Sequence, residues 1–129
     1  MSAIDTNVLV RLFIDTNAAQ TTAVQKYFAT EKHISIADIA LIEALYVLTE
    51  YYGKNRTAAC RCIASVLASP KVNCNRPLFT EALYLYEEHV ALSVEDCCLV
   101  VYAELNNSTP LYTFDKKLAR QTQHTELLQ

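Results

Sequence analysis

Four acidic residues stand at points of the chain where a carboxylate could do chemistry. They are Asp5, Glu43, Asp96 and Asp115. Asp5 and Asp115 each follow a short run of residues typical of a strand and precede the start of a helix. Ligands of open α/β sheets bind at the carboxyl ends of the strands, where helices that follow parallel strands begin. The four acids are therefore expected to meet in one pocket at that edge.

Glu43 is the only charged residue between Asp38 and Glu50, in a predicted helix over 39–52 that is otherwise apolar all round. A helix of that composition is expected to be buried. A buried carboxylate must be protonated, paired or bound to a cation. Glu43 is thus expected to be a buried acid, either paired with an Arg or Lys or part of a metal or catalytic site.

Helix capping is the alternative for the other three acids. Aspartate is a favoured N-cap, which would suffice to explain Asp5 and Asp115. Ser93-Val94-Glu95-Asp96 resembles a capping box, in which the acid bonds back to the first residue. The residues alone leave both interpretations open.

Carboxylates held together favour one kind of chemistry. Two of them about 4 Å apart repel each other by roughly 4 kcal/mol at an effective dielectric near 20. Such a cluster therefore requires protons or a cation, and oxygen ligands suit a hard ion such as Mg²⁺ or Mn²⁺. Hydrolysis of phosphodiester bonds uses ions of this kind.

Composition excludes several other functions. The chain has one glycine, so it cannot build the glycine-rich loops that cradle nucleotide phosphates. Its five cysteines lie in apolar runs without CxxC spacing, which argues against zinc and disulfides and favours a reduced cytoplasm. The net charge of −3 argues against a broadly basic nucleic-acid surface, so RNA binding would need a metal or local basic residues.

Strand and helix patterns alternate along the chain. Strands are expected at 2–4, 33–37, 72–74, 111–113 and 126–128, with helices between them. Alternation of this kind predicts an α/β fold with a parallel sheet and helices on both faces. No linker, signal peptide or membrane-spanning run is visible, so residues 1–129 are expected to form a single cytoplasmic domain that does not bind membranes.

Taken together, the acidic segments resemble a known family. The segments are Asp5-Thr6-Asn7-Val8-Leu9, Ile42-Glu43-Ala44-Leu45-Tyr46-Val47-Leu48, Ser93-Val94-Glu95-Asp96 and Tyr112-Thr113-Phe114-Asp115-Lys116-Lys117-Leu118-Ala119. Their order and spacing look like the four acidic motifs of PIN domains, and most of all those of the small VapC-like toxins.

That resemblance implies a three-layer α/β/α sandwich with a parallel, doubly wound central sheet. It also implies a Mg²⁺- or Mn²⁺-dependent endoribonuclease, usually the homodimeric toxin of a toxin-antitoxin pair, inhibited by its antitoxin protein. The four acids would be the catalytic and metal-binding residues, with Asn7 and Thr113 supporting them through hydrogen bonds. Some PIN nucleases carry a further acid after the last motif. Lys116 and Lys117 occupy that stretch here, which favours a four-acid site and leaves the number of ions open.

Three basic residues follow the last acid. Lys116, Lys117 and Arg120 are the candidates for contact with the RNA backbone. The alternative is that they form a solvated helix face whose positive charges interact favourably with the helix C-terminus.

Two other functions compete with ribonuclease activity. Phosphatases of the haloacid-dehalogenase kind need a second Asp two residues after the first, and Asn7 occupies that place. A catalytically silent PIN-like module would bind RNA or a protein without cutting. The presence of all four acids favours the enzyme.

Overall fold

The chain folds into seven α-helices, one π-helical segment and five short strands, and the computed structural model describes all residues, 1–129. All strand pairs are parallel. The expected α/β class with parallel strands is confirmed. The chain divides into two compact units, Met1–Asn75 and Arg76–Gln129, each with its own sheet. The expectation of one domain over 1–129 stays a prediction.

The first unit holds a three-stranded parallel sheet in the order β1-β2-β3. Its strands are β1 (Ser2–Ala3), β2 (Ile34–Ser35) and β3 (Val72–Asn73). Its helices are α1 (Thr6–Arg11), α2 (Ala18–Thr30), α3 (Asp38–Tyr46) and α4 (Arg56–Leu67), with the π-helical segment η1 (Val47–Tyr51) continuing α3. The strands are much shorter than the helices, so helix packing supplies most of the core.

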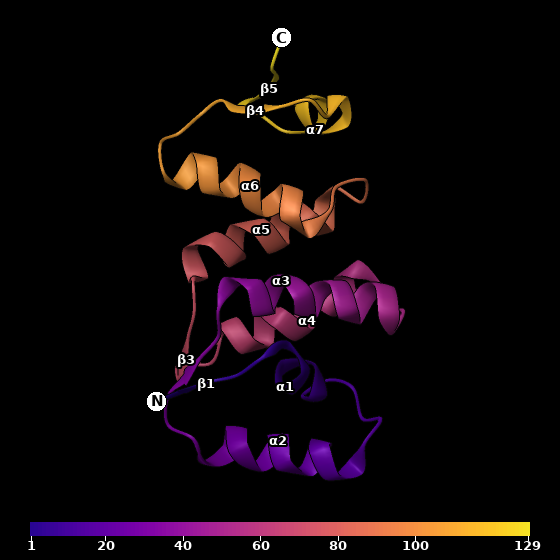
Figure 1. The fold of residues 1–129 in the computed structure, drawn as a ribbon, viewed down its shortest axis with the longest axis vertical. Coiled ribbons are helices and arrows are strands. Elements are labelled where there is room, and N and C mark those ends of the chain that lie inside the picture. The colour runs from indigo at the N-terminus through magenta and orange to yellow at the C-terminus, as the bar shows by residue number, and fades with distance from the viewer. The chain divides into compact units, whose positions relative to one another are not determined.

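Helix α1 lies between α2 and α3 in this unit, as Figure 1 shows. Leu9 on α1 and Leu41 and Leu45 on α3 are fully buried. Full burial of a leucine side chain contributes about 1.5–3 kcal/mol, so this layer fixes the position of α1 and of the residues that precede it.

Helix α3 widens at its end before the chain turns. In η1 the backbone bonds span five residues, as between the Tyr52 N–H and the Val47 carbonyl. The Thr49 hydroxyl donates to the Leu45 carbonyl at 2.8 Å. Gly53 then adopts a φ of +71°, a left-handed conformation that glycine enters without the steric penalty of a side chain. The chain's single glycine therefore stands where the end of this helix requires it.

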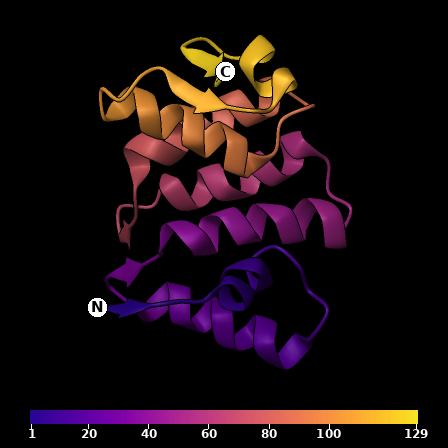
Figure 2. The same cartoon turned by 45° about the horizontal axis from the view of Figure 1, so that its top comes forward.

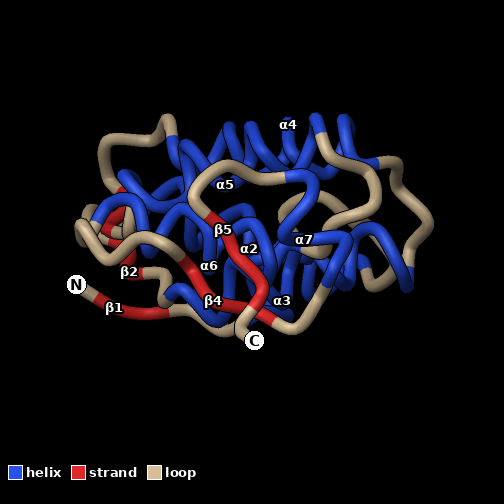
Figure 3. Tube along the Cα trace, turned by 90° about the horizontal axis from the view of Figure 1, so that it is seen from above, coloured by secondary structure: helices blue, strands red, loops and turns tan.

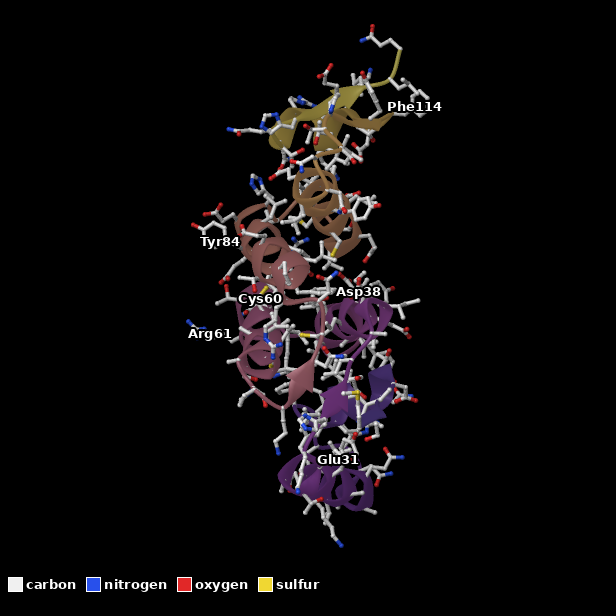
Figure 4. The ribbon with its side chains drawn as sticks, turned by 90° about the vertical axis from the view of Figure 1, so that its left-hand side faces the viewer. Glu31, Asp38, Cys60, Arg61, Tyr84 and Phe114 are labelled. Atoms are coloured by element: carbon white, nitrogen blue, oxygen red, sulfur yellow. The ribbon has the colours of Figure 1, made fainter.

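A hydrogen-bonded group ties the start of β1 to α2. The Ser2 hydroxyl donates to Glu31 at 2.9 Å and, with its one proton used there, accepts from Tyr27. Glu31, labelled in Figure 4, follows the last residue of α2. The bond from Ser2, followed by the bond from the Lys32 backbone, lowers the pKa of Glu31.

The second unit pairs two long helices with a two-stranded sheet. Helices α5 (Arg76–Glu88) and α6 (Val94–Leu105) pack side by side, as seen in Figure 2, and Phe79 and Cys97 are fully buried. Strands β4 (Leu111–Thr113) and β5 (Thr125–Leu127) lie next to each other in Figure 3 and are joined by α7 (Lys116–Gln121). None of the helices in either unit has the length and hydropathy that crossing a membrane requires.

Candidate functional site

Asp5 lies just beyond the carboxyl end of β1 and is the N-cap of α1. Its Oδ1 accepts the Val8 N–H at 3.0 Å, and the side chain is exposed. The second oxygen, Oδ2, accepts no hydrogen bond. The bond from the Val8 N–H fixes the direction of this carboxylate and leaves Oδ2 available to a further group.

Asp115 occupies the same position after β4. Its Oδ1 accepts the N–H groups of Lys117 at 2.9 Å and Leu118 at 3.2 Å, and it is the N-cap of α7. The Thr113 hydroxyl oxygen accepts the Asp115 N–H at 3.0 Å. The Thr113 proton is not used in that bond, so the hydroxyl can donate to a further acceptor, and Oδ2 of Asp115 is again free.

Asp96 belongs to the capping box that the sequence predicts. Its N–H donates to the Ser93 hydroxyl at 3.1 Å, and its Oδ2 accepts the Ser93 N–H at 3.5 Å. Asp96 is half-buried in the first turn of α6, and its Oδ1 has no partner. The capping role is therefore confirmed for Asp5, Asp96 and Asp115, and each of the three carboxylates keeps one oxygen available.

The expectation that Glu43 is buried is wrong. Glu43 is exposed, and the neighbours on its side of α3 include Ile39 and Tyr46, which are 72% and 58% exposed. The helix is apolar all round because it presents apolar side chains to solvent as well as to the core. Burial therefore does not force Glu43 to hold a proton or a cation, and its assignment to the site depends on its position in the motif.

The supporting and basic residues are all at the surface or close to it. Asn7 lies in the first turn of α1, exposed, and its amide donates no bond to Asp5. Lys116 and Lys117 are exposed in the first turn of α7, and Arg120 is exposed in its last turn. The macrodipole disfavours cations at a helix N-terminus. The explanation by favourable C-terminal charge is therefore wrong for the two lysines and holds only for Arg120.

Sequence reasoning did not single out Arg11, which shares a hollow with Asp5. The hollow has a volume of about 270 Å³ and lies between α1 and α2. Its polar lining residues are Asp5, Asn7, Arg11 and Gln20. An Arg on a short helix gives no special signal in a sequence, and one of the residues that hold it, Tyr52, is 41 residues away.

The donor set suits a hard cation. Carboxylate oxygens at three backbone-fixed positions, with a fourth on α3, are the ligands that Mg²⁺ and Mn²⁺ prefer. Two of the acids belong to Met1–Asn75 and two to Arg76–Gln129. No group of three His, Cys, Asp or Glu side chains arranged to hold a metal ion is present.

Residues 3–123 match the family model of the PIN domain. The chain belongs to the PIN-domain family. The match spans both compact units and all four acids. PIN domains have an α/β/α fold, with which the parallel strands and the helices of this chain are consistent. A search among curated proteins finds no relative.

Membership of this family gives the function in outline. PIN domains are generally metal-dependent nucleases that act on nucleic-acid substrates. The PIN fold of this chain is therefore a nuclease-type fold, in agreement with the chemistry expected from four oxygen-donor side chains.

Proposed function

We propose that this PIN domain is an endoribonuclease that uses Mg²⁺ or Mn²⁺ to cut phosphodiester bonds of single-stranded RNA. The proposed metal-binding and catalytic residues are Asp5, Glu43, Asp96 and Asp115. The supporting observation is that three of the four carboxylates accept backbone N–H groups through one oxygen while the other oxygen has no partner. Hydrogen-bonded carboxylates are typical of metal ligands, because the bonds fix their orientation.

The chain's own residues have separate roles in this proposal. The acids hold the cation, Thr113 fixes the start of α7, and Asn7 is available to hydrogen-bond the groups around the ion. Lys116, Lys117 and Arg120 attract the RNA backbone. When bound, the ion lowers the pKa of an attacking water and offsets the negative charge of the phosphate.

The position of the two lysines supports their role in RNA binding. They stand in the turn of α7 where the helix dipole disfavours positive charge, so helix stability does not account for them. A phosphate near Asp115 would be attracted by both ammonium groups, which compensates for the net charge of −3.

We also propose a toxin role, with a homodimeric state, a cognate antitoxin protein and a cytoplasmic location. The likeness of the four motifs to VapC-like toxins supports it. Large apolar side chains exposed on α3 and η1, including Tyr46 and Tyr51 at 58% and 77%, offer a surface for a protein partner. None of the five cysteines forms a disulfide, which suits a reducing compartment.

A metal-titrated cleavage assay tests the proposal. Single-stranded RNA is incubated with the protein in chelator, in Mg²⁺ and in Mn²⁺, and the products are resolved on a gel. We expect cleavage inside the strand only when a divalent ion is present. RNA binding without cleavage in any metal would show instead a silent PIN-like module.

A further inference from the structure

We infer that Arg11 binds a phosphate of the RNA strand, next to the phosphate that the acidic residues act on. This inference depends on the proposed ribonuclease function and adds a substrate-binding residue to it.

The Arg11 guanidinium is held in place by three neutral groups. Its Nε donates to the Gln20 side-chain oxygen at 2.9 Å, and its Nη1 donates to the Thr16 hydroxyl at 2.8 Å and the Tyr52 hydroxyl at 3.3 Å. These acceptors come from α2, from the loop before it and from the residue after η1. Three separate segments therefore fix the plane of the guanidinium, which lowers the entropy cost of forming a further bond.

The charge of Arg11 is not neutralised. The side chain is half-buried, and none of its partners is a carboxylate. The bond that Arg11 donates lowers the pKa of Tyr52. The two N–H groups of Nη2 have no acceptor. The two Nη2 N–H groups point in different directions, so this fixed, partly desolvated guanidinium is suited to donate a charge-assisted bond to one phosphate oxygen.

The hollow places this cation beside a proposed metal ligand. Asp5 and Arg11 line the same cavity, together with Asn7 and Gln20, and form no ion pair with each other. Arg11 lies six residues after Asp5, about 9 Å further along the axis of α1. That separation is suited to a second phosphate of a strand whose first phosphate lies near Asp5.

Salt-dependent binding tests the inference without cleavage. A short, fluorescently labelled single-stranded RNA of mixed sequence is titrated with protein in chelator, and anisotropy is followed over a range of salt. We expect Arg11→Met to weaken binding on the order of tenfold, as for a bond to a charged group. The slope of log affinity against log salt should fall by about 0.7, the value for one phosphate contact on a single strand. Lys26→Met removes an exposed charge of α2 outside the hollow, and its effect on the slope should be clearly smaller.

Gln20→Glu separates phosphate binding from a purely structural role. The substitution keeps the bond to Arg11 and gives the guanidinium a carboxylate partner, so the melting temperature should hold or rise. RNA affinity should fall on the order of tenfold because the charge of Arg11 is now paired. Gln25→Glu adds the same charge elsewhere on α2 and should weaken binding much less.

The outcomes separate this inference from the proposed function. If the wild type cleaves RNA with Mg²⁺ but Arg11→Met and Gln20→Glu bind RNA with its affinity and slope, the inference is overturned and the ribonuclease stands. A wild type that neither binds nor cleaves RNA overturns the ribonuclease proposal itself.

Discussion

Two segments of the chain repeat one plan, and they differ in how firmly the aspartate that caps the helix is held. In each, a short parallel strand ends, one residue follows, and an aspartate caps a helix of six residues. The first segment is β1, Asp5 and α1, and the second is β4, Asp115 and α7. We call them the Asp5 segment and the Asp115 segment.

The Asp115 segment is held more firmly to its own helix. Asp115 accepts two backbone N–H groups and has its own N–H bound by Thr113, whereas Asp5 accepts one N–H. The residue before the cap also differs, since Ile4 is half-buried while Phe114, labelled in Figure 4, is 78% exposed. Asp5 is therefore freer to serve a ligand, and Asp115 contributes more to local structure.

The largest effect is expected on cleavage. Asn caps helices as well as Asp does, so Asp5→Asn and Asp115→Asn should fold normally while losing the charge of a proposed metal ligand. Loss of a residue that hydrogen-bonds a metal ligand typically lowers metal affinity or activity about 10–100-fold. Loss of a ligand itself should therefore lower kcat/KM by at least about 100-fold. The fall should be greater for Asp5→Asn. Measured with Mg²⁺ and single-stranded RNA, activity near that of the control Glu81→Gln in either variant would reduce that aspartate to a cap.

The next effect concerns stability, and it should be larger for Asp115 than for Asp5, which is the reverse of the order expected for cleavage. Replacing an N-cap by Ala costs about 0.5–2 kcal/mol. Because Asp115 accepts two N–H groups, Asp115→Ala should lie in the upper half of that range and Asp5→Ala in the lower half. Urea unfolding, with the Asn variants as charge controls, measures both. Equal losses, or a larger loss at Asp5, would contradict the difference between the segments.

Metal-linked melting is a smaller effect. Mg²⁺ at about ten times its dissociation constant should add about 1.4 kcal/mol to the free energy of unfolding, since the ion binds the folded state preferentially. For a domain of this size the melting temperature should rise by about 4–8 °C. The rise should shrink most in Asp5→Asn. If the full rise persists in both Asn variants, the ion binds elsewhere.

The smallest effect is local to the start of the Asp5 segment. The pKa of Glu31 is lowered, chiefly by the Ser2 hydroxyl, so the contribution of Glu31 is present above the unfolded pKa. It is lost as the pH falls through the folded pKa. Ser2→Ala should raise the Glu31 pKa toward its ordinary value, as followed by NMR titration of the side-chain carboxyl. An unmoved titration would mean that Ser2 does not hold Glu31.

The sequence predicted local structure better than burial. Gly53 marks the helix end because a left-handed residue is a strictly local requirement, and the capping box at Ser93 depends on residues only three apart. Glu43 was misjudged because the exposure of a helix depends on which neighbours pack on it, and α3 leaves Ile39 in solvent. Arg11 could not be found from the sequence because Tyr52, one of its acceptors, is 41 residues away.

Strand ends were located within a residue or two because turn-forming and polar residues bound them. Leu111–Thr113 was predicted with its observed limits, and the last strand begins one residue earlier than expected, at Thr125. Which acids share one cation depends on long-range packing, which neither residue types nor spacing encode. The site as a whole therefore stays a prediction that the experiments above decide.

The π-helical turn at Val47–Tyr51 makes the position of Tyr52 sensitive to the loss of a single residue. A backbone ring that spans five residues accommodates one residue more than an α-helical turn, and each residue accounts for about 100° of helix rotation. The extra residue thus sets the angle at which Tyr52 leaves the helix and reaches Arg11. Removing a single residue from this turn would let α3 run on as a regular helix but swing the phenol by roughly a quarter of a turn. The Arg11 guanidinium would lose the Tyr52 hydroxyl as an acceptor, although no residue near Arg11 in the sequence had changed.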